Sequence, residues 1–596
     1  MAERKRNTFN VDEELDAPFD IRHLKRAMGY IKKYSLNYIK VFTISVFAIL
    51  LSLLTPLLTK YVIDDFIPQG NIPLIFLVGL AFILISIIIV ICNKMRTRIN
   101  NVTGQHIISE IRADLFIHLQ NLPFDYYDSR PAGKILVRVV NYVNTIADFL
   151  SSGLVSFLIE PLSMIFIVIY AAVFVSWQLT LVMLCGVPFF AAYILLIKVH
   201  TRRAWQKVSN KQSNTTAYIA ENVNGVKVTQ AFSREGKNIE VMDELLDDSR
   251  NSWMKAMYLS HSMWPATAVL ARIVASAIYI IGAAVLAGLT ETLTVGVVIA
   301  MVGYSWRFWA PLQQLGNLYN SLITSVAYLE RIFQLLDEPI TISDNEDAYE
   351  LPVIQGNVSF KDTIFSYEPG IPVLKGVSFE ALAGESIALV GPTGAGKSTI
   401  INLLSRFYVL TDGNISIDGH DINKVTLNSL RRQMGIMMQD TFIFSGNIIE
   451  NIRYGRLDAT DEECIDAAKT VFADEFISKL PKGYYTETDE RGEGFSAGQK
   501  QLISFARTLL SDPRVLILDE ATSSIDTNTE LLVQEGIANL LVGRTSFIVA
   551  HRLSTIRNCS KIIYIDGGNI AEMGSHNELM DKKGAYYRLC VSQNIM

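Results

Sequence analysis

The feature that most constrains this chain is a set of six apolar segments in its first half, each about 20 residues long. A segment of this length and composition matches the thickness of the hydrocarbon layer of a bilayer. Because lipid offers the backbone no hydrogen-bond partners, such segments fold as helices that satisfy their own N–H and C=O groups. The sequence therefore predicts six transmembrane helices, near Tyr38–Thr59, Pro73–Cys92, Phe149–Tyr170, Leu179–Val199, Met263–Leu286 and Leu293–Trp309.

The distribution of basic residues predicts the orientation of these helices. Lys and Arg are frequent in the two long connections, residues 93–146 and 200–262, whereas the loop after the first span carries Asp64 and Asp65. Cytoplasmic connections carry an excess of Lys and Arg, so we expect both connections and both termini in the cytoplasm. The polar residues 1–19 lack the apolar core of a cleavable signal. The chain is thus expected to be a multi-pass protein of a bacterial plasma (inner) membrane.

Charge and cysteine spacing argue against a nucleic-acid partner and against a metal bound by cysteines. The net charge is −6, which gives no support for a nucleic-acid-binding surface, and we predict no nucleic acid partner. The five cysteines are widely scattered, without the close spacing of a metal site. They are expected to be packing residues: Cys92, Cys185, Cys464, Cys559 and Cys590.

A glycine-rich loop, GPTGAGKST, carries the strongest chemical signal. It fits the phosphate-binding pattern G-x-x-x-x-G-K-[ST], with an apolar strand-like segment before it and a helical segment after it. Its glycines let backbone N–H groups face a phosphate, its lysine reaches the outer phosphates, and its serine hydroxyl can bind Mg²⁺. The sequence therefore predicts a site for ATP and Mg²⁺ at Gly391, Pro392, Thr393, Gly394, Ala395, Gly396, Lys397, Ser398 and Thr399.

Two adjacent acids supply the expected second half of this site. Asp519 and Glu520 follow the apolar run Val515–Leu518, which has the composition of a buried strand. Ligands bind at the carboxyl ends of the strands in α/β sheets. We expect Asp519 to hold Mg²⁺, directly or through water, and Glu520 to polarise the attacking water.

The change in composition along the chain defines the domains and the fold class. We predict a multi-domain protein in which an all-α polytopic transmembrane domain, with six helices and long intracellular extensions, precedes an α/β P-loop nucleotide-binding domain. The acidic segment LLDEPITISDNEDAYELP lacks apolar periodicity and marks the linker. The predicted parts are a cytoplasmic tail at residues 1–19, the transmembrane domain at 20–334, the linker at 335–352 and the nucleotide-binding domain at 353–596.

Six spans with two long intracellular hairpins and a following nucleotide-binding domain resemble a half-transporter of the ATP-binding cassette (ABC) exporter family, over nearly the whole chain. Leu122–Val143 and Glu221–Glu235 resemble the family's two coupling segments, whose tips dock on nucleotide domains. The resemblance implies an ATPase coupled to transmembrane transport and a multidrug or lipid type of exporter. It also implies a dimer, because in this family the signature segment of one domain contacts the nucleotide bound by the other.

The same resemblance assigns roles to further residues. Tyr367 stands where the family stacks an aromatic ring on adenine, and Gln439 matches the glutamine that touches the metal and the water. His551, in VAHRLST, matches the histidine that contacts the γ-phosphate. Asp526 ends the segment that crosses the dimer interface in the family. Together with Glu520, Gln439 and His551 form the expected catalytic set.

The signature segment departs from the family's usual form. It reads FSAGQKQ where LSGGQ is usual, so that Ser496, Gly498 and Gln499 are kept while Phe495 and Ala497 differ. Beside an intact Glu520, this altered segment resembles the consensus-Walker subunit of a heterodimeric bacterial multidrug exporter. We therefore expect a second half-transporter as partner, and the alternative is a homodimer, such as a lipid or lipid-linked-substrate flippase.

The cargo is weakly encoded in the sequence. Apolar and aromatic spans, in contact with membrane lipid, suit hydrophobic or amphipathic small molecules. Arg307, in SWRFWAPLQQLG with Trp306, Phe308, Trp309 and Gln313, is a charge within a span, which is a functional-site hypothesis by default. It contacts either the cargo or, by snorkelling, the lipid headgroups. Two other classes stay open: an ATP-gated channel, against which Glu520 and His551 argue, and a membrane-anchored soluble ATPase, which would need only one span.

Overall fold

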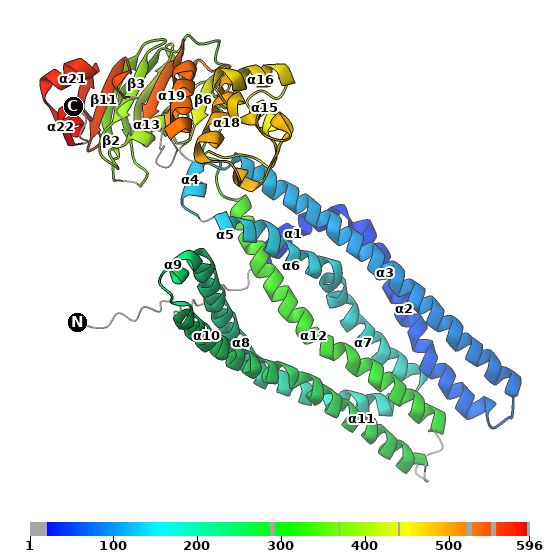
Figure 1. Ribbon diagram of the computed structural model, residues 1–596. Coiled ribbons are helices and arrows are strands. Elements are labelled where there is room, and N and C mark those ends of the chain that lie inside the picture. The colour runs from blue at the N-terminus through cyan, green and yellow to red at the C-terminus, as the bar shows by residue number, and fades with distance from the viewer. Residues whose placement is uncertain are drawn as a thin grey trace. The chain divides into compact units, whose positions relative to one another are not determined.

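The computed structural model describes residues 21–130, 132–286, 293–368, 370–438, 441–519, 527–549 and 556–592. The chain divides into two compact units, each described by itself. The helical unit comprises residues 1–120 and 132–338, and the nucleotide unit comprises residues 121–131 and 339–596. Figure 1 shows long helices in the first unit and mixed helices and strands in the second.

The helical unit is built from long helices, several of which exceed the thickness of a bilayer (Figure 1). The longest is α3, with 50 residues. The helices are α1 (Ile21–Lys33), α2 (Ser35–Tyr61), α3 (Ile72–Asn121), α5 (Ala132–Val137), α6 (Val143–Asp148), α7 (Leu154–Phe174), α8 (Trp177–Asn224), α9 (Val226–Ala231), α10 (Glu235–His261), α11 (Met263–Leu286) and α12 (Val295–Leu336). Three π-helical turns, Val62–Phe66, Arg138–Tyr142 and Phe149–Gly153, extend or join them.

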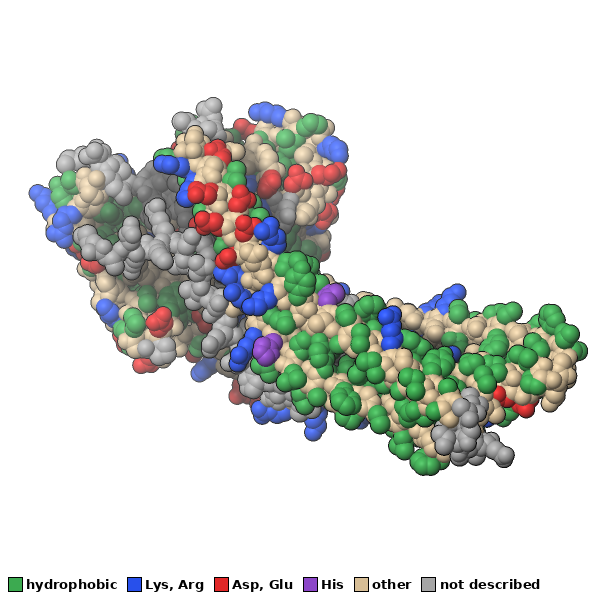
Figure 2. All heavy atoms as spheres, turned by 90° about the horizontal axis from the view of Figure 1, so that it is seen from below, with side chains coloured by type: hydrophobic (Ala, Val, Ile, Leu, Met, Phe, Trp, Pro, Cys, Tyr) green, Lys and Arg blue, Asp and Glu red, His purple; other side chains and the backbone are tan. Residues whose placement is uncertain are grey.

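Six stretches of this unit, among the described residues, are long and apolar enough to cross a membrane. This number confirms the predicted six spans. Large apolar side chains on them are exposed, including Phe76 at 76 % and Leu80 at 67 %. Figure 2 shows hydrophobic side chains over much of the long helices on the face in view. In water such a surface would be unfavourable, whereas lipid is as apolar as the side chains themselves.

Helix α12 forms much of the core of the helical unit. Its residues Met301, Tyr304 and Trp309 are almost completely buried, and they pack with residues of α2, α7, α8 and α11. Gly186 of α8 allows a close approach, because a Cβ atom there would lie 2.5 Å from the Trp309 ring. Small residues at such contacts are typical of helix packing in membranes.

The nucleotide unit contains two main sheets (Figure 1). The larger has the strand order β12-β11-β3-β10-β9-β6, in which β11, β3, β10, β9 and β6 run parallel. The smaller is antiparallel, with the order β2-β1-β4-β5. The strands are β1 (Val358–Phe365), β2 (Leu374–Ala381), β3 (Ser386–Val390), β4 (Asp412–Ile417), β5 (His420–Asp421), β6 (Met434–Met437), β7 (Gly446–Asn447), β8 (Glu487–Thr488), β9 (Val515–Asp519), β10 (Thr545–Val549), β11 (Lys561–Asp566) and β12 (Asn569–Gly574).

Both faces of the parallel sheet are buried, as continuous apolar strands require. Along β9, Leu516 and Leu518 enter one hydrophobic cluster, and Val515 and Ile517 enter the other. The first cluster includes residues of α18 and α19, and the second includes residues of α13 and the antiparallel sheet. The helices of this unit are α4 (Phe124–Asp128), α13 (Lys397–Leu404), α14 (Leu427–Arg431), α15 (Ile448–Arg453), α16 (Asp461–Thr470), α17 (Asp474–Ile477), α18 (Ala497–Leu510), α19 (Thr527–Leu541), α21 (His576–Lys582) and α22 (Ala585–Ser592).

Residues 121–131, which lie between two helices of the helical unit in sequence, belong to the nucleotide unit. The ring of Phe124 lies 4.5 Å from the ring of Phe407, centroid to centroid. The Tyr408 hydroxyl donates a hydrogen bond to the Asp128 carboxylate. These contacts hold α4 beside the segment that follows α13.

Candidate functional site

The glycine-rich loop connects β3 to α13 as the sequence pattern requires. Gly391 has φ +145° and Gly396 has φ +107°, in the region that favours glycine. A Cβ atom at Gly391 would lie 2.1 Å from the carbonyl oxygen of Ile565 on the neighbouring strand β11. The loop can therefore take this path only with glycine at that position. It ends at Lys397, where α13 begins and its first backbone N–H groups have no partner within the helix.

Lys397 is buried, with 8 % of its surface exposed. Its Nζ donates to the carbonyl oxygens of Gly391 at 2.8 Å and Pro392 at 2.9 Å, so that its side chain closes the loop on itself. Burial lowers the pKa of Lys397, and the nearby carboxylate of Asp519 partly opposes this effect. The loop therefore presents a cation and free N–H groups at one helix end, an arrangement that attracts phosphate.

Tyr367 lies beside Thr399, the last residue of the GPTGAGKST segment. Its hydroxyl is 3.2 Å from Oγ1 of Thr399, and its ring meets Phe365 and Tyr408 edge to face at 4.8 and 5.1 Å. These contacts fix the orientation of the ring, yet 44 % of the residue remains exposed. A fixed and partly exposed aromatic ring next to a phosphate loop can stack on a nucleobase.

Ser398 and Asp519 supply oxygen ligands of the kind that Mg²⁺ prefers. The Ser398 side chain is exposed in the first turn of α13, and Asp519 ends β9. The effect of the Asp519 carboxylate on Lys397 indicates that it lies near the loop. Among the described residues there is no cluster of three His, Cys, Asp or Glu side chains able to hold a metal by themselves. A hydroxyl and one carboxylate fit a Mg²⁺ ion whose remaining ligands are phosphate oxygens and water.

Four predicted site residues lie outside the described residues: Gln439, Glu520, Asp526 and His551. The strands that precede three of them are described. β6, β9 and β10 are neighbours in the parallel sheet, and they precede Gln439, Glu520 and His551, respectively. Since β3 leads into the phosphate loop and runs parallel to β10, all four strands end at one edge of the sheet. The sheet topology therefore directs these segments of the chain to the edge where the loop lies.

The signature residues form a helix cap. Oγ of Ser496 accepts a hydrogen bond from the N–H of Gln499, and Oε1 of Gln499 accepts one from the N–H of Ser496. This capping box begins α18. Gly498 is buried within the first turn, and Phe495 packs against Phe476 at 6.3 Å between ring centroids.

Capping explains why this segment has Ser and Gln three residues apart, a role that the sequence reasoning missed. The pattern S-x-x-Q before an apolar helix was the available signal. The departures from the usual signature leave the cap intact, because Phe495 lies before it and Ala497 is exposed in the first turn.

Arg307 makes a contact that the sequence reasoning did not anticipate. Its Nη1 donates to the carbonyl oxygen of Ser52 in α2. Pro56 lies four residues after Ser52 and has no N–H, so this carbonyl has no donor within its own helix. The hydroxyl of Tyr304 donates to the next carbonyl, that of Leu53, at 2.5 Å. Arg307 thus joins α12 to the proline position of α2.

The aromatic residues around Arg307 do not share one environment. Phe308 and Trp309 are buried in the core of the helical unit, at 3 % and 1 % exposure, whereas Trp306 is 47 % exposed. The side chain of Gln313 lies outside the described part of the chain. Phe308 and Trp309 therefore serve helix packing rather than line an open cavity.

Comparison with known proteins places these features in a family. Residues 38–311 match the ABC transporter transmembrane region family, and residues 374–523 match the ABC transporter family. YknV of Bacillus subtilis (strain 168), an uncharacterised ABC transporter ATP-binding protein, is 40 % identical over 589 residues, which cover 98 % of this chain and 97 % of the relative. The chain therefore belongs to the ABC transporter family.

Other relatives define the kind of transporter. YgaD of Bacillus subtilis, named for multidrug export, is 36 % identical over 96 % of this chain and 99 % of its own length. A fatty acid ABC transporter ATP-binding/permease protein of Mycobacterium bovis is 39 % identical over 83 % of this chain and 78 % of the relative. A bacterial Atm1-family ABC exporter with ATP bound matches the fold with a TM-score of 0.78 at 28 % identity, covering 97 % of this chain and all of that one.

The chain is thus an ABC exporter half-transporter, a multi-pass membrane protein and an ATPase coupled to transport. It binds ATP, and like other ABC exporters it functions as a dimer.

Proposed function

We propose that this half-transporter uses ATP hydrolysis to export hydrophobic or amphipathic compounds. The observation that carries the proposal is the buried Lys397 in a closed phosphate loop, on a chain whose described residues include six helices long enough to span a bilayer. A loop of this kind positions a nucleoside triphosphate for hydrolysis. The spans provide a path for cargo through the membrane.

In the proposed mechanism each residue of the nucleotide site has one task. The N–H groups of Gly394, Gly396 and their neighbours bind the phosphates, Lys397 neutralises the outer phosphate charge, and Tyr367 stacks on adenine. Ser398, Gln439 and Asp519 hold Mg²⁺, which neutralises charge on the phosphates. Glu520 polarises the attacking water, and His551 contacts the γ-phosphate. The roles of Gln439, Glu520 and His551 rest on the family resemblance and on the strands that precede them.

The transmission of motion is assigned to residues 121–131, which belong to the nucleotide unit but lie between two helices of the helical unit in sequence. Phe124 and Asp128 contact Phe407 and Tyr408, and this supports a coupling role for residues 121–131. Tyr408 in turn touches Tyr367. Movement of the nucleotide-binding elements would therefore reach α4 through two aromatic contacts.

The dimer is proposed to place Ser496, Gly498, Gln499 and Asp526 of one subunit against the nucleotide of the other. A heterodimer with a second half-transporter is favoured by Phe495 and Ala497. The intact capping box favours the alternative, a homodimer, because the N–H groups at the start of α18 stay available to a phosphate. Purification of the chain expressed alone separates the two: a stable homodimer with full ATPase activity would contradict the heterodimer.

We also propose a bacterial plasma membrane, with both termini in the cytoplasm. The positions of Lys and Arg between the spans support this orientation. A tag at either terminus should be accessible to protease only after the cell membrane is permeabilised, and accessibility in intact cells would contradict the orientation.

The direct test of export is flux in proteoliposomes. The full-length transporter, with any partner that co-purifies, is reconstituted with a fluorescent hydrophobic amine, and ATP is added outside. Molecules with outward-facing nucleotide domains should accumulate the amine in the lumen, whereas Lys397→Ala should abolish accumulation. ATP hydrolysis without flux of any tested amphiphile would favour a channel or regulatory subunit.

A further inference from the structure

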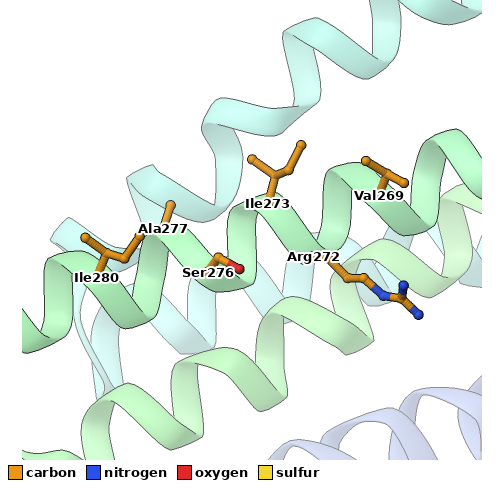
Figure 3. Close-up of a pocket in the computed structure, with 6 residues that line it drawn as sticks. All are labelled: Val269, Arg272, Ile273, Ser276, Ala277 and Ile280. Atoms are coloured by element: carbon orange, nitrogen blue, oxygen red, sulfur yellow. The ribbon is translucent and has the colours of Figure 1, made fainter.

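Two features of the molecule differ in the number of elements that build them. Figure 3 shows an open groove of about 410 Å³ on α11, lined by Val269, Arg272, Ile273, Ser276, Ala277 and Ile280. All six side chains come from this one helix. In the nucleotide unit, in contrast, the side chain of Asn451 lies where three segments of the chain meet. A network that joins several segments can transmit the movement of one segment to another.

Asn451 is almost completely buried, with 2 % of its surface exposed. Its Nδ2 donates to the carbonyl oxygens of Phe444 at 2.9 Å and Asn447 at 3.0 Å, and to Oγ1 of Thr488 at 3.3 Å. Its Oδ1 accepts from the N–H of Phe444 at 2.9 Å and from Nη2 of Arg507 at 3.0 Å. Both polar atoms of the side chain are therefore used, and a satisfied buried network of this kind fixes the segments that it joins.

The three segments are residues 442–451, residues 487–495 and helix α18. The first segment follows Gln439, which is proposed to hold Mg²⁺ in this subunit's own ATP site. The second leads into α18, whose cap residue Ser496 is proposed to face the nucleotide of the other subunit. Asn451 therefore stands between a segment that serves one ATP and a helix that serves the other.

Helix α18 is held at both ends to the segment that contains Asn451. Near its carboxyl end, Arg507 donates through Nε to the carbonyl oxygen of Asn451 at 2.8 Å and through Nη1 to that of Phe442 at 3.1 Å. Just before its cap, Gly492 has φ +64°, and a Cβ atom there would lie 3.1 Å from the Cβ atom of Ile443. With contacts at both ends, the helix is expected to move together with residues 442–451 and not independently of them.

The second segment is tied to the first by backbone and side-chain bonds. Strands β7 and β8 pair Gly446 with Thr488 and Asn447 with Glu487. The Thr488 hydroxyl also donates to the carbonyl oxygen of Phe444 at 2.7 Å. The residues that lead into α18 are therefore fixed to the same segment as the helix itself.

We propose that Asn451 and Arg507 are positioning residues through which the two ATP sites of the dimer communicate. When the segment after Gln439 responds to ATP bound by this subunit, the network moves α18 and the signature residues that it presents to the other subunit's ATP. ATP in one site should therefore raise the affinity of the other site for ATP by about fivefold or more. This proposal rests on the dimer of the proposed function, in which the signature residues of one subunit face the nucleotide of the other.

The test measures ATP hydrolysis by the full-length transporter, with any partner that co-purifies, in lipid nanodiscs over a range of ATP concentrations. Communicating sites should give the unchanged protein a sigmoidal dependence on ATP. Arg507→Lys keeps the charge but loses the fixed fork of donors, so the dependence should become hyperbolic. A residue with only a structural role would lower the folded fraction and the rate but leave the shape of the curve unchanged. An equally sigmoidal curve in Arg507→Lys would overturn the proposal.

Arg544→Lys is the matched control. Arg544 also donates three hydrogen bonds, to the carbonyl oxygens of Pro513 and Leu540 and to the carboxylate of Asp512, at 3.0 to 3.1 Å. It precedes the amino end of β10, whereas the phosphate loop follows the carboxyl end of the parallel strand β3. The control should lose a similar amount of stability in chemical denaturation and keep the sigmoidal curve. A hyperbolic curve in both variants would show a general effect of destabilisation and overturn the assignment.

Thr488→Val is a milder variant that keeps the proposal testable if Arg507→Lys does not fold. It removes the hydroxyl that donates to Phe444 and accepts from Asn451, while the side chain stays similar in size. The dependence on ATP should become less sigmoidal, because the second segment is then less firmly tied to the first. A curve that matches the unchanged protein would contradict the role of this network.

The outcomes separate this proposal from the export function. If the unchanged protein transports an amphiphile but hydrolyses ATP along a hyperbolic curve, export stands and communication between the sites fails. If Arg507→Lys abolishes a sigmoidal curve although the unchanged protein transports no amphiphile, communication stands and the proposed export fails.

Discussion

The two units of this protein satisfy the polar groups of their helices in different ways. Among the described helices of the nucleotide unit, three begin with a capping box in which both partners lie within three residues, Thr460 with Glu463, Ser496 with Gln499, and Ser575 with Glu578. In the helical unit, α8 and α12 begin with a single capping hydroxyl, that of Ser176 and that of Thr294, and α12 gains a further acceptor from a distant part of the chain. The carboxylate of Asp64 accepts from the N–H of Gly296 at 2.8 Å and from the Thr294 hydroxyl, although more than 200 residues separate them.

Asp64 lies in the loop after the first span, so the solvent accounts for a different set of contacts, those of Arg307 and Tyr304 with the carbonyls of Ser52 and Leu53 within a span. A helix end in water has water as an alternative partner, so that a short local cap is sufficient. Inside a bilayer the only partners are other protein groups, so that kinks and free carbonyls must be satisfied between helices. Contacts in the helical unit therefore carry information about helix pairing, and caps in the nucleotide unit mainly fix helix boundaries.

The largest expected effect concerns chemistry in the nucleotide unit. Glu520→Gln should lower the ATP hydrolysis rate by about a hundredfold or more, because the residue that polarises water is lost while phosphate binding is kept. Lys397→Ala should instead abolish ATP binding. Nucleotide binding and turnover, measured on both variants, check this division. Unchanged hydrolysis in Glu520→Gln would contradict the assigned role.

Asp418 tests whether a long-range cap can also stabilise the nucleotide unit. Its carboxylate accepts N–H groups of Gln355, Gly356 and Asn357, at 2.6 to 3.1 Å. Burial raises the pKa of Asp418, but these hydrogen bonds outweigh it and hold the pKa below its usual value. Asp418→Asn should cost about 3 kcal/mol of unfolding free energy at neutral pH, as expected for several hydrogen bonds to a charged group.

The pH dependence of this effect has a defined sign. Because the folded pKa of Asp418 is depressed, its stabilisation is complete above the unfolded pKa of about 4 and is lost as the pH falls through the folded value. The stability difference between the protein and Asp418→Asn should therefore shrink on acidification below about pH 4. Chemical denaturation curves at several pH values check this. A difference that grows at low pH would contradict the hydrogen-bond account.

Asp64 provides the corresponding test in the helical unit. Asp64→Ala should cost about 2 kcal/mol, because it removes the acceptor for the Gly296 N–H and the Thr294 hydroxyl. Thermal unfolding in detergent should show the loss. Asp65→Ala, at the neighbouring position, is the control, and an equal loss in both variants would show that the effect is general to this turn.

Ser496 tests how much a local helix cap contributes to the free energy of unfolding, and we expect the contribution to be small. Ser496→Ala removes one half of the capping box and should cost about 1 kcal/mol of stability. Ser496→Thr retains the hydroxyl and should lose little. Since the same residue is proposed to face the partner's nucleotide, hydrolysis should fall further than stability explains. A fall in proportion to the folded fraction alone would remove Ser496 from the composite site.

The smallest effect is expected at the Pro56 position. Pro56→Ala supplies an N–H to the Ser52 carbonyl, which then no longer depends on Arg307. In a double-mutant cycle with Arg307→Gln, the coupling energy should be about 0.6 kcal/mol, the usual size for hydrogen bonds between membrane helices. A coupling energy of zero would indicate that Arg307 does not act through this carbonyl.

Several features were predictable because each depends on a local pattern. The six spans, the strand–loop–helix around Gly391 and Lys397, and the strand ending at Asp519 all follow from composition and spacing. The contact of Arg307 with Ser52 was not predictable, because it depends on which helices pack together and on their rotation.

By itself the sequence determined the division into a membrane part and a nucleotide part, the class of transporter, and the phosphate loop. Hydrophobicity and backbone conformational preference act over a few residues, so they can be read along the chain. Only the tertiary structure decided that residues 121–131 belong to the nucleotide unit, that Asp64 accepts a hydrogen bond from the start of α12, and that Arg307 bonds to α2. These features depend on contacts between residues distant in sequence, and such contacts are set by the packing of whole helices and strands.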